Sequence, residues 1–291
     1  MGDEYLRLYL STVAWALALA LAFYLPERLA PAEKGQPGVN RIANLIYTPV
    51  VIAIIFLIQP LFNPVFTLVL TFSGGGLLWA VITRPSGVAG QVIFAVAFAV
   101  VWDIWQYWVH RLQHRSNYLW QTHRFHHSET ALNATSQARH HALNNIPALI
   151  GYLPMVMLFG SQHPHFVATF LMFRLWGFVN HANVRINFGP LTPIVAGPQW
   201  HRIHHSIESQ HLDQNFATFF PFIDKLFGTY YAPQKDEYPR TGLLDGQSTL
   251  REATVEPLFG LGRITLAQVR KLRLRGRQGK CEIGEELGRL G

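Results

Sequence analysis

Long apolar stretches alternate with short polar ones over the first two thirds of the chain. They cover residues 8–24, 45–57, 65–82, 91–109, 146–159 and 166–179. A hydrocarbon core of about 30 Å requires about 20 helical residues, so 45–57 is marginal as a span. The letters QPLFNP separate it from 65–82, which itself contains three consecutive glycines. One of these two runs is therefore expected to be re-entrant or interfacial, and we predict four to six membrane-inserted helices.

The first apolar stretch is expected to be an uncleaved span. Asp3 and Glu4 precede it, where a secretory signal would carry positive charge. Arg28, Lys34 and Arg41 then mark the following loop as cytoplasmic by the positive-inside rule. The arginines among the histidines further along the chain indicate the same side. We therefore expect an integral protein of an inner or plasma membrane whose site faces the cytosol.

Clustered histidines are the most informative polar positions. They form the motifs HRLQH, HRFHH and HRIHH, whose members are His110, His114, His123, His126, His127, His201, His204 and His205. On a helix, residues i and i+4 lie about 40° apart and residues i and i+3 about 60° apart on the other side, so each motif projects its imidazoles from one face. A tetrahedral zinc ion uses no more than four ligands, so eight imidazoles indicate two metal ions. Imidazole binds zinc, copper, iron and nickel, and ligand type alone leaves the metal open.

With their neighbours, these motifs resemble the fatty acid hydroxylase and sterol desaturase superfamily of integral-membrane di-iron enzymes. The resemblance covers roughly 103–231. Beyond the histidine motifs it is carried by D-x-x-x-Y-W-x-H-R from Asp103, L-W-x-x-H from Leu119, R-x-H at Arg139, H-x-N at His181, D-x-N at Asp213 and D-x-L-F-G-T from Asp224. It implies an all-α fold in which polytopic membrane helices carry an extramembrane, histidine-rich di-metal cap.

The resemblance also implies roles for individual residues. His181 joins the eight motif histidines as a ninth metal ligand. Five further residues are implied as groups that support the site from outside the ligand set: Asp103, Tyr107, His141, Asn183 and Asn215. Where some relatives carry one more histidine after the position of His181, this chain has Arg185.

Members of that superfamily use two irons, dioxygen and two electrons to oxidise an unactivated C–H bond. The resemblance therefore implies an enzyme that hydroxylates, or desaturates, a lipid such as a fatty acyl chain, a sterol or a polycyclic lipid. Zinc could stand in for iron after overexpression. The sequence shows no reductase, ferredoxin or haem-binding motif, so we expect an external reductase with a ferredoxin or cytochrome-type carrier. Three regions follow: membrane-spanning helices in 1–100, a catalytic region in 101–240 with a second helix pair at 146–180, and a basic tail in 241–291.

A membrane metal-ion transporter or metal-binding protein is the main alternative, because intramembrane histidines often mark ion pathways. The position of the motifs beside Arg, Gln and Asn, at the ends of apolar runs, favours a fixed site outside the bilayer core. A zincin protease is excluded because HExxH is absent. A soluble carboxylate-rich di-iron bundle needs paired Glu-x-x-His motifs, and the chain offers only Glu208 with His211.

The remaining histidines are assigned by their positions. His163 and His165 lie between two apolar runs and are expected on the opposite membrane face. His140 and His141 adjoin, so no more than one should face the metals, and His141 fits the R-x-H motif. His211 is expected in a loop or just outside the ligands.

Asp103 is an unusual charge in an apolar helix, on the same stripe as Tyr107, His110 and His114. Such a charge needs a partner inside a membrane. Ligating imidazoles nearly always donate their second N–H to a carboxylate or a carbonyl. We expect Asp103 to accept such a bond from a histidine of another motif; the alternative is a salt bridge to Arg139.

Composition excludes several other functions. The 291 residues are 49% hydrophobic and 14% charged, typical of a membrane protein. The net charge of +7 owes much to a basic cluster in 263–280, and no nucleic-acid-binding motif accompanies it, so no nucleic acid is expected as a partner. Cys281 is the only cysteine, so neither a disulfide framework nor a cysteine metal cluster is available.

Overall fold

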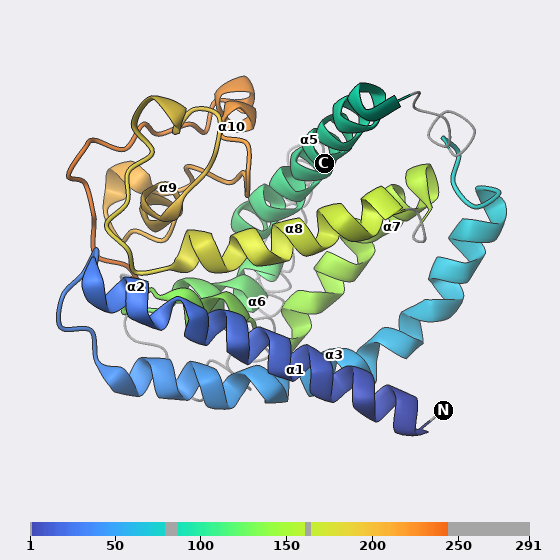
Figure 1. The fold of residues 1–291 in the computed structure, drawn as a ribbon, viewed down its shortest axis with the longest axis horizontal. Coiled ribbons are helices and arrows are strands. Elements are labelled where there is room, and N and C mark those ends of the chain that lie inside the picture. Colours follow the sequence, from blue (N-terminus) through green and yellow to red (C-terminus); the bar gives the residue numbers. More distant parts are fainter. Residues whose placement is uncertain (1, 79–86, 161–163, 244–291) are drawn as a thin grey trace, which may run out of the picture.

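The computed structural model describes residues 2–78, 87–160 and 164–243, and within them the fold is built from helices (Figure 1). These are α1 (Gly2–Ala22), α2 (Tyr24–Leu29), α3 (Gly38–Phe72), α5 (Gly87–Arg115), α6 (Asn117–His127), α7 (Asn145–Phe159), α8 (Pro164–His181), α9 (Pro198–His204) and α10 (Phe222–Phe227). Single 3-10 turns occur at Ala134–Ala138, Ala142–Asn144, Gly189–Leu191 and Ser209–His211. The all-α prediction is confirmed. Most of the basic tail, from 244 on, lies outside the described residues.

Three helical segments are long and apolar enough to cross a membrane: Asp3–Leu29, α3 and α5. Few of their residues are buried within the protein, and large side chains such as Trp15, Leu57 and Phe72 are exposed. An apolar surface of this extent is typical of contact with acyl chains rather than water. The segments therefore indicate an integral membrane protein. Within the described residues they are fewer than the four to six inserted helices expected, and α7 and α8 are a shorter pair of 15 and 18 residues.

The apolar runs 45–57 and 65–82, which were expected to be separate segments on either side of QPLFNP, are not separate. Residues 45–57 and the start of 65–82 belong to one helix of 35 residues, α3, which contains Pro49, Pro60 and Pro64. Proline removes one backbone donor and crowds the preceding turn, which bends a long helix without necessarily ending it. Figure 1 shows α3 turning upward over its second half. The helix ends before Gly74, the first of three glycines with positive φ.

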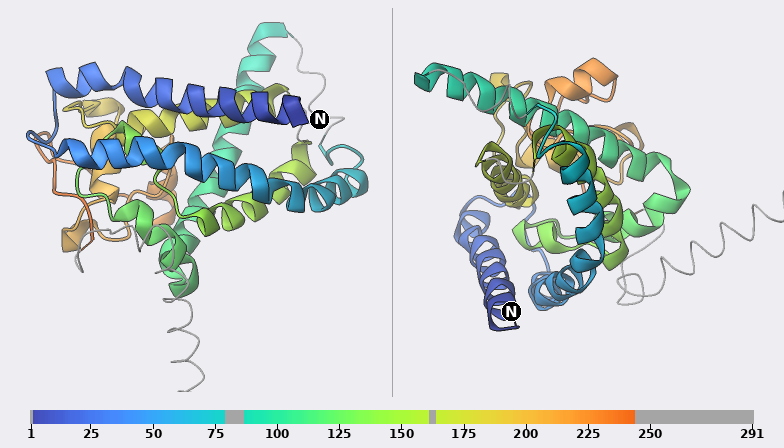
Figure 2. Two further views of the ribbon diagram at one scale, coloured as in Figure 1. Left: turned by 90° about the horizontal axis from the view of Figure 1, so that it is seen from below. Right: turned by 90° about the vertical axis from the view of Figure 1, so that its right-hand side faces the viewer.

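Helices α1 and α3 form one side of the molecule and lie side by side in both views of Figure 2. Tyr5 and Tyr9 of α1 donate hydrogen bonds to the carbonyl oxygens of Phe56 (2.7 Å) and Pro49 (3.2 Å) of α3. Helix α5 crosses behind α8 in Figure 1, and an aromatic core between α5, α7 and α8 holds them together. Its buried members are Phe98, Ala99, Trp102, Met155, Phe159 and Phe173.

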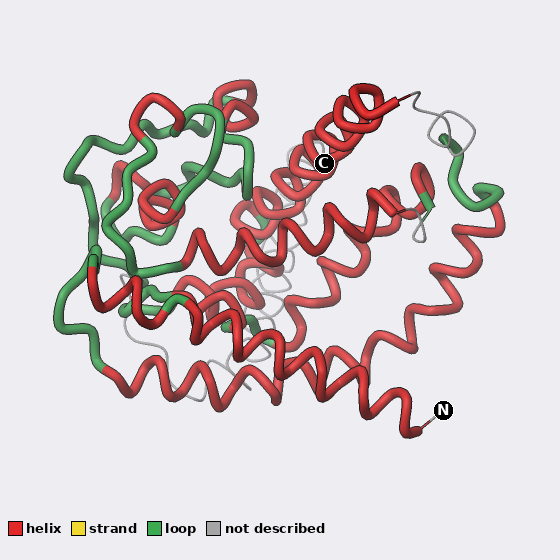
Figure 3. The backbone as a smooth tube through the Cα atoms, viewed as in Figure 1, coloured by secondary structure: helices red, strands yellow, loops and turns green. Residues whose placement is uncertain are grey.

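The polar loops gather at one end of the molecule, on the left of Figure 3. The histidine motifs meet at this end, because they lie at the last turns of α5 and α8, along α6, and in α9. Buried Glu27 ties the N-terminal helices to this end. Its carboxylate pairs with Arg41 at 2.6 Å and accepts the backbone N–H groups of Ala134 (2.8 Å) and Asn183 (2.9 Å). Glu27, which lies outside the histidine motifs, therefore fixes the position of segments that lie next to the clustered histidines.

Candidate metal centre

All nine expected ligand histidines come together in two groups. One group holds His110, His114, His123, His127 and His204; the other holds His126, His181, His201 and His205. Within each group the ligand nitrogens lie within 4.8 Å of one another. The two buried clusters are consistent with a di-metal site.

Each HxxHH motif contributes to both groups, in opposite senses. In α6, His123 and His127 join the first group while His126 joins the second. In and just after α9, His201 and His205 join the second group while His204 joins the first. Residues i and i+4 lie about 40° apart on a helix, whereas i+3 and i+4 lie about 100° apart, so the outer pair of each motif points one way and the inner residue points the other. Each group therefore contains histidines from both motifs.

The imidazole nitrogens in each group approach one another closely. In the first group, His127 Nε2 lies 3.1 Å from His114 Nε2 and 3.2 Å from His123 Nε2. In the second, His181 Nε2 lies 3.1 Å from the Nε2 atoms of both His126 and His201. Two nitrogens bound to one ion at about 2.1 Å are separated by about 3.0–3.4 Å. The spacing fits ligands that share an ion.

Backbone carbonyls fix the tautomers of three of these rings. The Nδ1 atoms of His110, His181 and His204 donate to the carbonyl oxygens of Phe216 (3.0 Å), Gly177 (2.7 Å) and Gln214 (2.8 Å). In a neutral ring, Nε2 then carries a lone pair. The buried Nε2 of His204 has no hydrogen-bond partner in the described residues, so its lone pair is available for a metal ion.

Burial keeps these imidazoles neutral. Removal from water, followed by the proximity of the other histidines, lowers the pKa of His126, His127, His204 and His205 well below the ordinary value of 6.5. A metal ion binds the neutral ring and competes with a proton for it. Donor type, spacing, tautomer and protonation state all fit two metal ions.

Among the described residues, Asp213 is a carboxylate that contacts a histidine of these two groups. Its Oδ1 lies 3.3 Å from Nδ1 of His114, and this contact lowers the pKa of Asp213. The role was expected of Asp103, and that expectation is wrong. Asp103 instead accepts the backbone N–H groups of 218, 219 and 220 at 2.7–2.9 Å, and its hydrogen bonds within the described residues include none to a histidine. Asp213 belongs to the D-x-N motif named above, but the motif alone does not show that this aspartate contacts His114.

The alternative salt bridge between Asp103 and Arg139 is also wrong. Arg139 donates to Asn44 Oδ1 (3.2 Å), Phe125 O (3.2 Å) and Ser128 Oγ (3.1 Å). The arginine therefore braces the end of α6 against α3.

Tyr107 and Asn215 lie behind the ligands rather than among them. The Tyr107 hydroxyl contacts Thr229 Oγ1 at 2.9 Å and accepts from Arg111 at 2.8 Å. Asn215 has a positive φ of 61°, and its Oδ1 accepts the backbone N–H of Tyr231 at 2.8 Å. It stands between residues 214 and 216, whose carbonyls hold His204 and His110. Both residues shape the segment that orients ligand rings.

Asn183 and His141 form hydrogen bonds with backbone groups. Asn183 exchanges two hydrogen bonds of 2.9 Å with the backbone of Glu33, which fastens the segment after α8 to the N-terminal loop. His141 accepts the backbone N–H of Leu143 at 3.1 Å. Its neighbour His140 faces the site instead and stacks on His126, with ring centroids 4.3 Å apart and planes 14° apart. Burial lowers the pKa of His140 to about 3.

Two remaining expectations concern histidines away from the groups. His211 lies in the loop after α9, as expected, where it is fully buried and contacts Ser206 Oγ (2.8 Å) and Glu237 Oε1 (3.1 Å). His163 lies outside the described residues. His165 is in the first turn of α8 and His181 in its last, at opposite ends of the helix.

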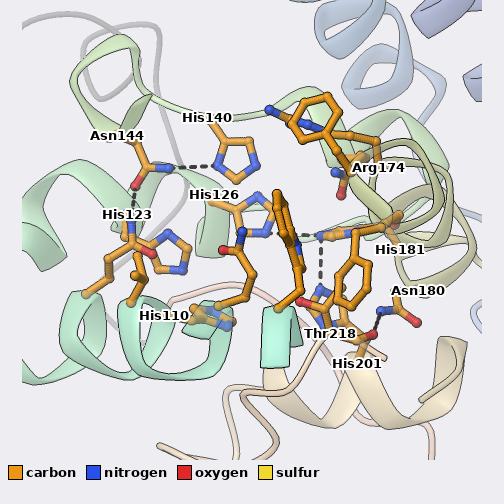
Figure 4. A pocket seen from close by; sticks show the side chains of 18 of the residues that line it. His110, His123, His126, His140, Asn144, Arg174, Asn180, His181, His201 and Thr218 are labelled. Atoms are coloured by element: carbon orange, nitrogen blue, oxygen red, sulfur yellow. Dashed lines mark hydrogen bonds between the residues drawn. The ribbon is translucent and has the colours of Figure 1, made fainter. Parts of the chain in front are cut away.

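A cavity of about 190 Å³ adjoins the ligands (Figure 4). Five of the nine histidines line it: His110, His123, His126, His181 and His201. Aromatic side chains from the core of α5, α7 and α8 form another part of its wall: Trp102, Tyr152, Phe170 and Phe173. The cavity thus joins the histidine groups to the apolar part of the fold, which sequence motifs alone did not reveal.

Comparisons with known proteins cover this same region. Residues 95–229 match the fatty acid hydroxylase family. Alkylglycerol monooxygenase of Homo sapiens is 34% identical over 131 residues, which are 45% of this chain and 29% of that protein. Ornithine lipid hydroxylase OlsE of Rhizobium tropici is 29% identical over 156 residues, 53% of this chain and 46% of that protein. A delta(7)-sterol 5(6)-desaturase of Gibberella zeae is 28% identical over 144 residues, 49% of this chain and 39% of that protein.

The chain spans less than half the length of each of these relatives. No solved structure matches it significantly. The relatives are monooxygenases, hydroxylases and desaturases, and the matched residues contain all nine clustered histidines. The resemblance inferred from the motifs is therefore confirmed: residues 95–229, which contain the histidine motifs, match the fatty acid hydroxylase family.

Proposed function

We propose that this protein is a membrane-bound di-iron oxidoreductase that uses dioxygen and external electrons to hydroxylate, or desaturate, a C–H bond of a lipid. One observation carries the proposal: two buried groups of histidines adjoin a cavity that aromatic side chains line in part. A metal centre beside a cavity with an aromatic part to its wall suits the oxidation of an acyl chain, a sterol or a polycyclic lipid. The catalytic region is proposed to be 101–240.

The residues of this chain have distinct parts in that reaction. Five histidines of one group and four of the other are proposed to hold one iron each. When bound, the irons would supply the reduction of dioxygen and the oxidation of the C–H bond. Phe216 and Gln214 orient His110 and His204 through their carbonyls, and Asp213 supports His114. Trp102 and Phe173 exclude water from the cavity and position the apolar substrate.

Location and electron supply complete the proposal. The apolar helices would lie in an inner or plasma membrane, with the histidine end on the cytosolic side. An external reductase with a ferredoxin or cytochrome-type carrier would deliver the electrons. The orientation in the membrane is inferred from the positions of the basic residues, and the external electron supply from the lack of a reductase, ferredoxin or haem-binding motif in the sequence.

Metal analysis tests the centre. Protein purified without chelators should hold close to two iron per chain, or zinc after overexpression. His126→Ala and His204→Ala each remove one ligand from a different group and should each lower the metal content. His211→Gln, in a buried histidine that belongs to neither group, is the control and should keep both ions if the protein stays folded. One ion or none in the wild type would count heavily against a di-iron enzyme.

Lipid profiling tests the reaction. A deletion strain should lose an oxidised lipid and accumulate its precursor, and a plasmid with the wild-type gene should restore the product. A plasmid with His126→Ala should not. A strain whose lipids are unchanged, but whose metal uptake falls, would favour a transporter.

A further inference from the structure

Arg174 is a cation in an unusual place. It lies in the second half of α8, lines the cavity, and is also exposed at the molecular surface. It therefore stands at the mouth of the cavity. Leu171 and Leu175 beside it on α8 are largely exposed, at 58% and 50%, so the outer surface of α8 next to Arg174 is apolar. Figure 4 shows Arg174 on the same side of the cavity as His140, away from His110 and His201.

No acidic side chain balances this charge in the described residues. Arg174 has no ion pair there, its guanidinium lies over the ring of Phe170 at 5.2 Å, and none of the residues that line the cavity is acidic. A cation in apolar surroundings is unfavourable without a counter-charge. Arginine also presents a planar set of donors that matches a carboxylate or a phosphate with two parallel hydrogen bonds. The missing anion is therefore expected from the ligand.

We propose that the lipid bound in this cavity carries an anionic headgroup, a carboxylate or a phosphate, which pairs with Arg174 at the cavity mouth. The inference rests on the proposed function in taking the occupant to be the lipid substrate. The headgroup would lie at the surface beside Arg174, and the apolar part would enter between Tyr152, Phe170 and Phe173 towards the histidines. Sterols and other lipids without an acidic group would then bind weakly.

Binding of three lipids that share one acyl chain tests this inference. The probes are palmitate, palmitoyl-lysophosphatidate and the uncharged monopalmitoylglycerol, each measured by equilibrium dialysis against the full chain in a neutral detergent. We expect at least one anionic probe to bind about 10-fold more tightly than the uncharged one. Preference for palmitate would identify a carboxylate, and preference for the lysophosphatidate would identify a phosphate. Equal binding of all three would overturn the proposal.

Substitution of Arg174 tests whether this side chain causes the preference for anionic lipids. Arg174→Gln should weaken anionic binding about 10-fold and leave the uncharged probe unchanged, whereas Arg174→Lys should keep part of the preference because it keeps the charge. Arg28→Gln is the matched control, since Arg28 also lies over an aromatic ring, that of Tyr24 at 5.6 Å, but on α2 away from the cavity. A preference that survives in a folded Arg174→Gln protein would contradict the proposal.

The assay separates this inference from the proposed function. Dialysis needs neither iron nor turnover, so an Arg174-dependent preference in a protein that oxidises no lipid would support the inference and reject the function. Oxidation of an uncharged lipid, with no anionic preference in binding, would support the function and reject the inference.

Discussion

Glu33 and Arg202 form an ion pair of 2.7 Å that joins the loop before α3 to the helix that carries His201 and His204. The Arg202 side chain is only 4% exposed, and its Nε also donates to Pro239 O at 2.8 Å. The partner carboxylate lies outside the region that matches the fatty acid hydroxylase family. Glu33, from the N-terminal third of the chain, thus stabilises the position of two of the clustered histidines.

Glu33→Gln should therefore destabilise the protein. It leaves the buried guanidinium of Arg202 without a counter-charge, and because the Glu33 side chain is itself 32% exposed, the free energy of unfolding should fall by about 2 kcal/mol, between the values for buried and exposed pairs. The measurement is the thermal midpoint in detergent, together with metal content. Asp236→Asn is the control, because it breaks an exposed pair with Arg185, 3.1 Å long, that is worth less than about 1 kcal/mol. Equal shifts for the two variants would show that the buried pair has no special role.

Asp213→Asn should weaken metal binding without unfolding the protein. The substitution removes the charge beside His114 Nδ1, and loss of such a partner typically lowers metal affinity about 10-fold to 100-fold. Asp213 has a positive φ of 57°, which asparagine adopts readily, and its side chain is 53% exposed, so backbone strain and burial change little. Chelator competition measures the affinity. Unchanged retention of both ions would remove Asp213 from the metal centre.

The sequence predicted which histidines cluster because helical spacing is a local property. On a helix, HRLQH, HRFHH and HRIHH each keep their imidazoles within about 100° of one another around the axis, whatever the rest of the chain does. The division into two groups was not predictable, because it depends on which helices meet. His126 leaves its motif neighbours to join His181 of α8, a residue 55 positions away.

The contacts that individual polar residues make could not be predicted from the sequence either. His140 and His141 were distinguished by a family motif, yet the backbone between Arg139 and the turn Ala142–Asn144 aims His140 at His126. The proline-containing stretch QPLFNP favoured two helices by local propensity. Continuation of the helix through Pro60 and Pro64 shows that tertiary context overrode that propensity.

Asp103→Asn should act on stability before it acts on metal. The carboxylate accepts three backbone N–H groups from 218–220, and an amide can accept on only one of its two atoms. Loss of charge-assisted bonds to buried donors should lower the free energy of unfolding by about 3 kcal/mol. The thermal midpoint and the iron content should fall together. A variant that loses metal at a wild-type midpoint would instead indicate a direct effect on a ligand ring.

Asp224 gives the chain a measurable pH dependence. Burial raises the pKa of this carboxyl from 3.8 to about 6, although it accepts the backbone N–H groups of Phe216 (2.7 Å) and Ala217 (2.9 Å). Between these two pKa values the folded protein binds more protons at Asp224 than the unfolded chain does. The contribution of Asp224 to stability is therefore largest at low pH and falls as the pH rises through this window.

Asp224→Asn should abolish that component. From about pH 4.5 to about pH 7, the stability of the wild type relative to the variant should fall by about 2 kcal/mol and then stay level. Thermal midpoints of the two metal-free proteins in detergent measure the difference. The buried histidines have the opposite pH dependence, since their pKa values are lowered, but they are common to both proteins and cancel in the comparison. A difference that stays constant across this range would mean that Asp224 titrates like a solvent-exposed carboxyl.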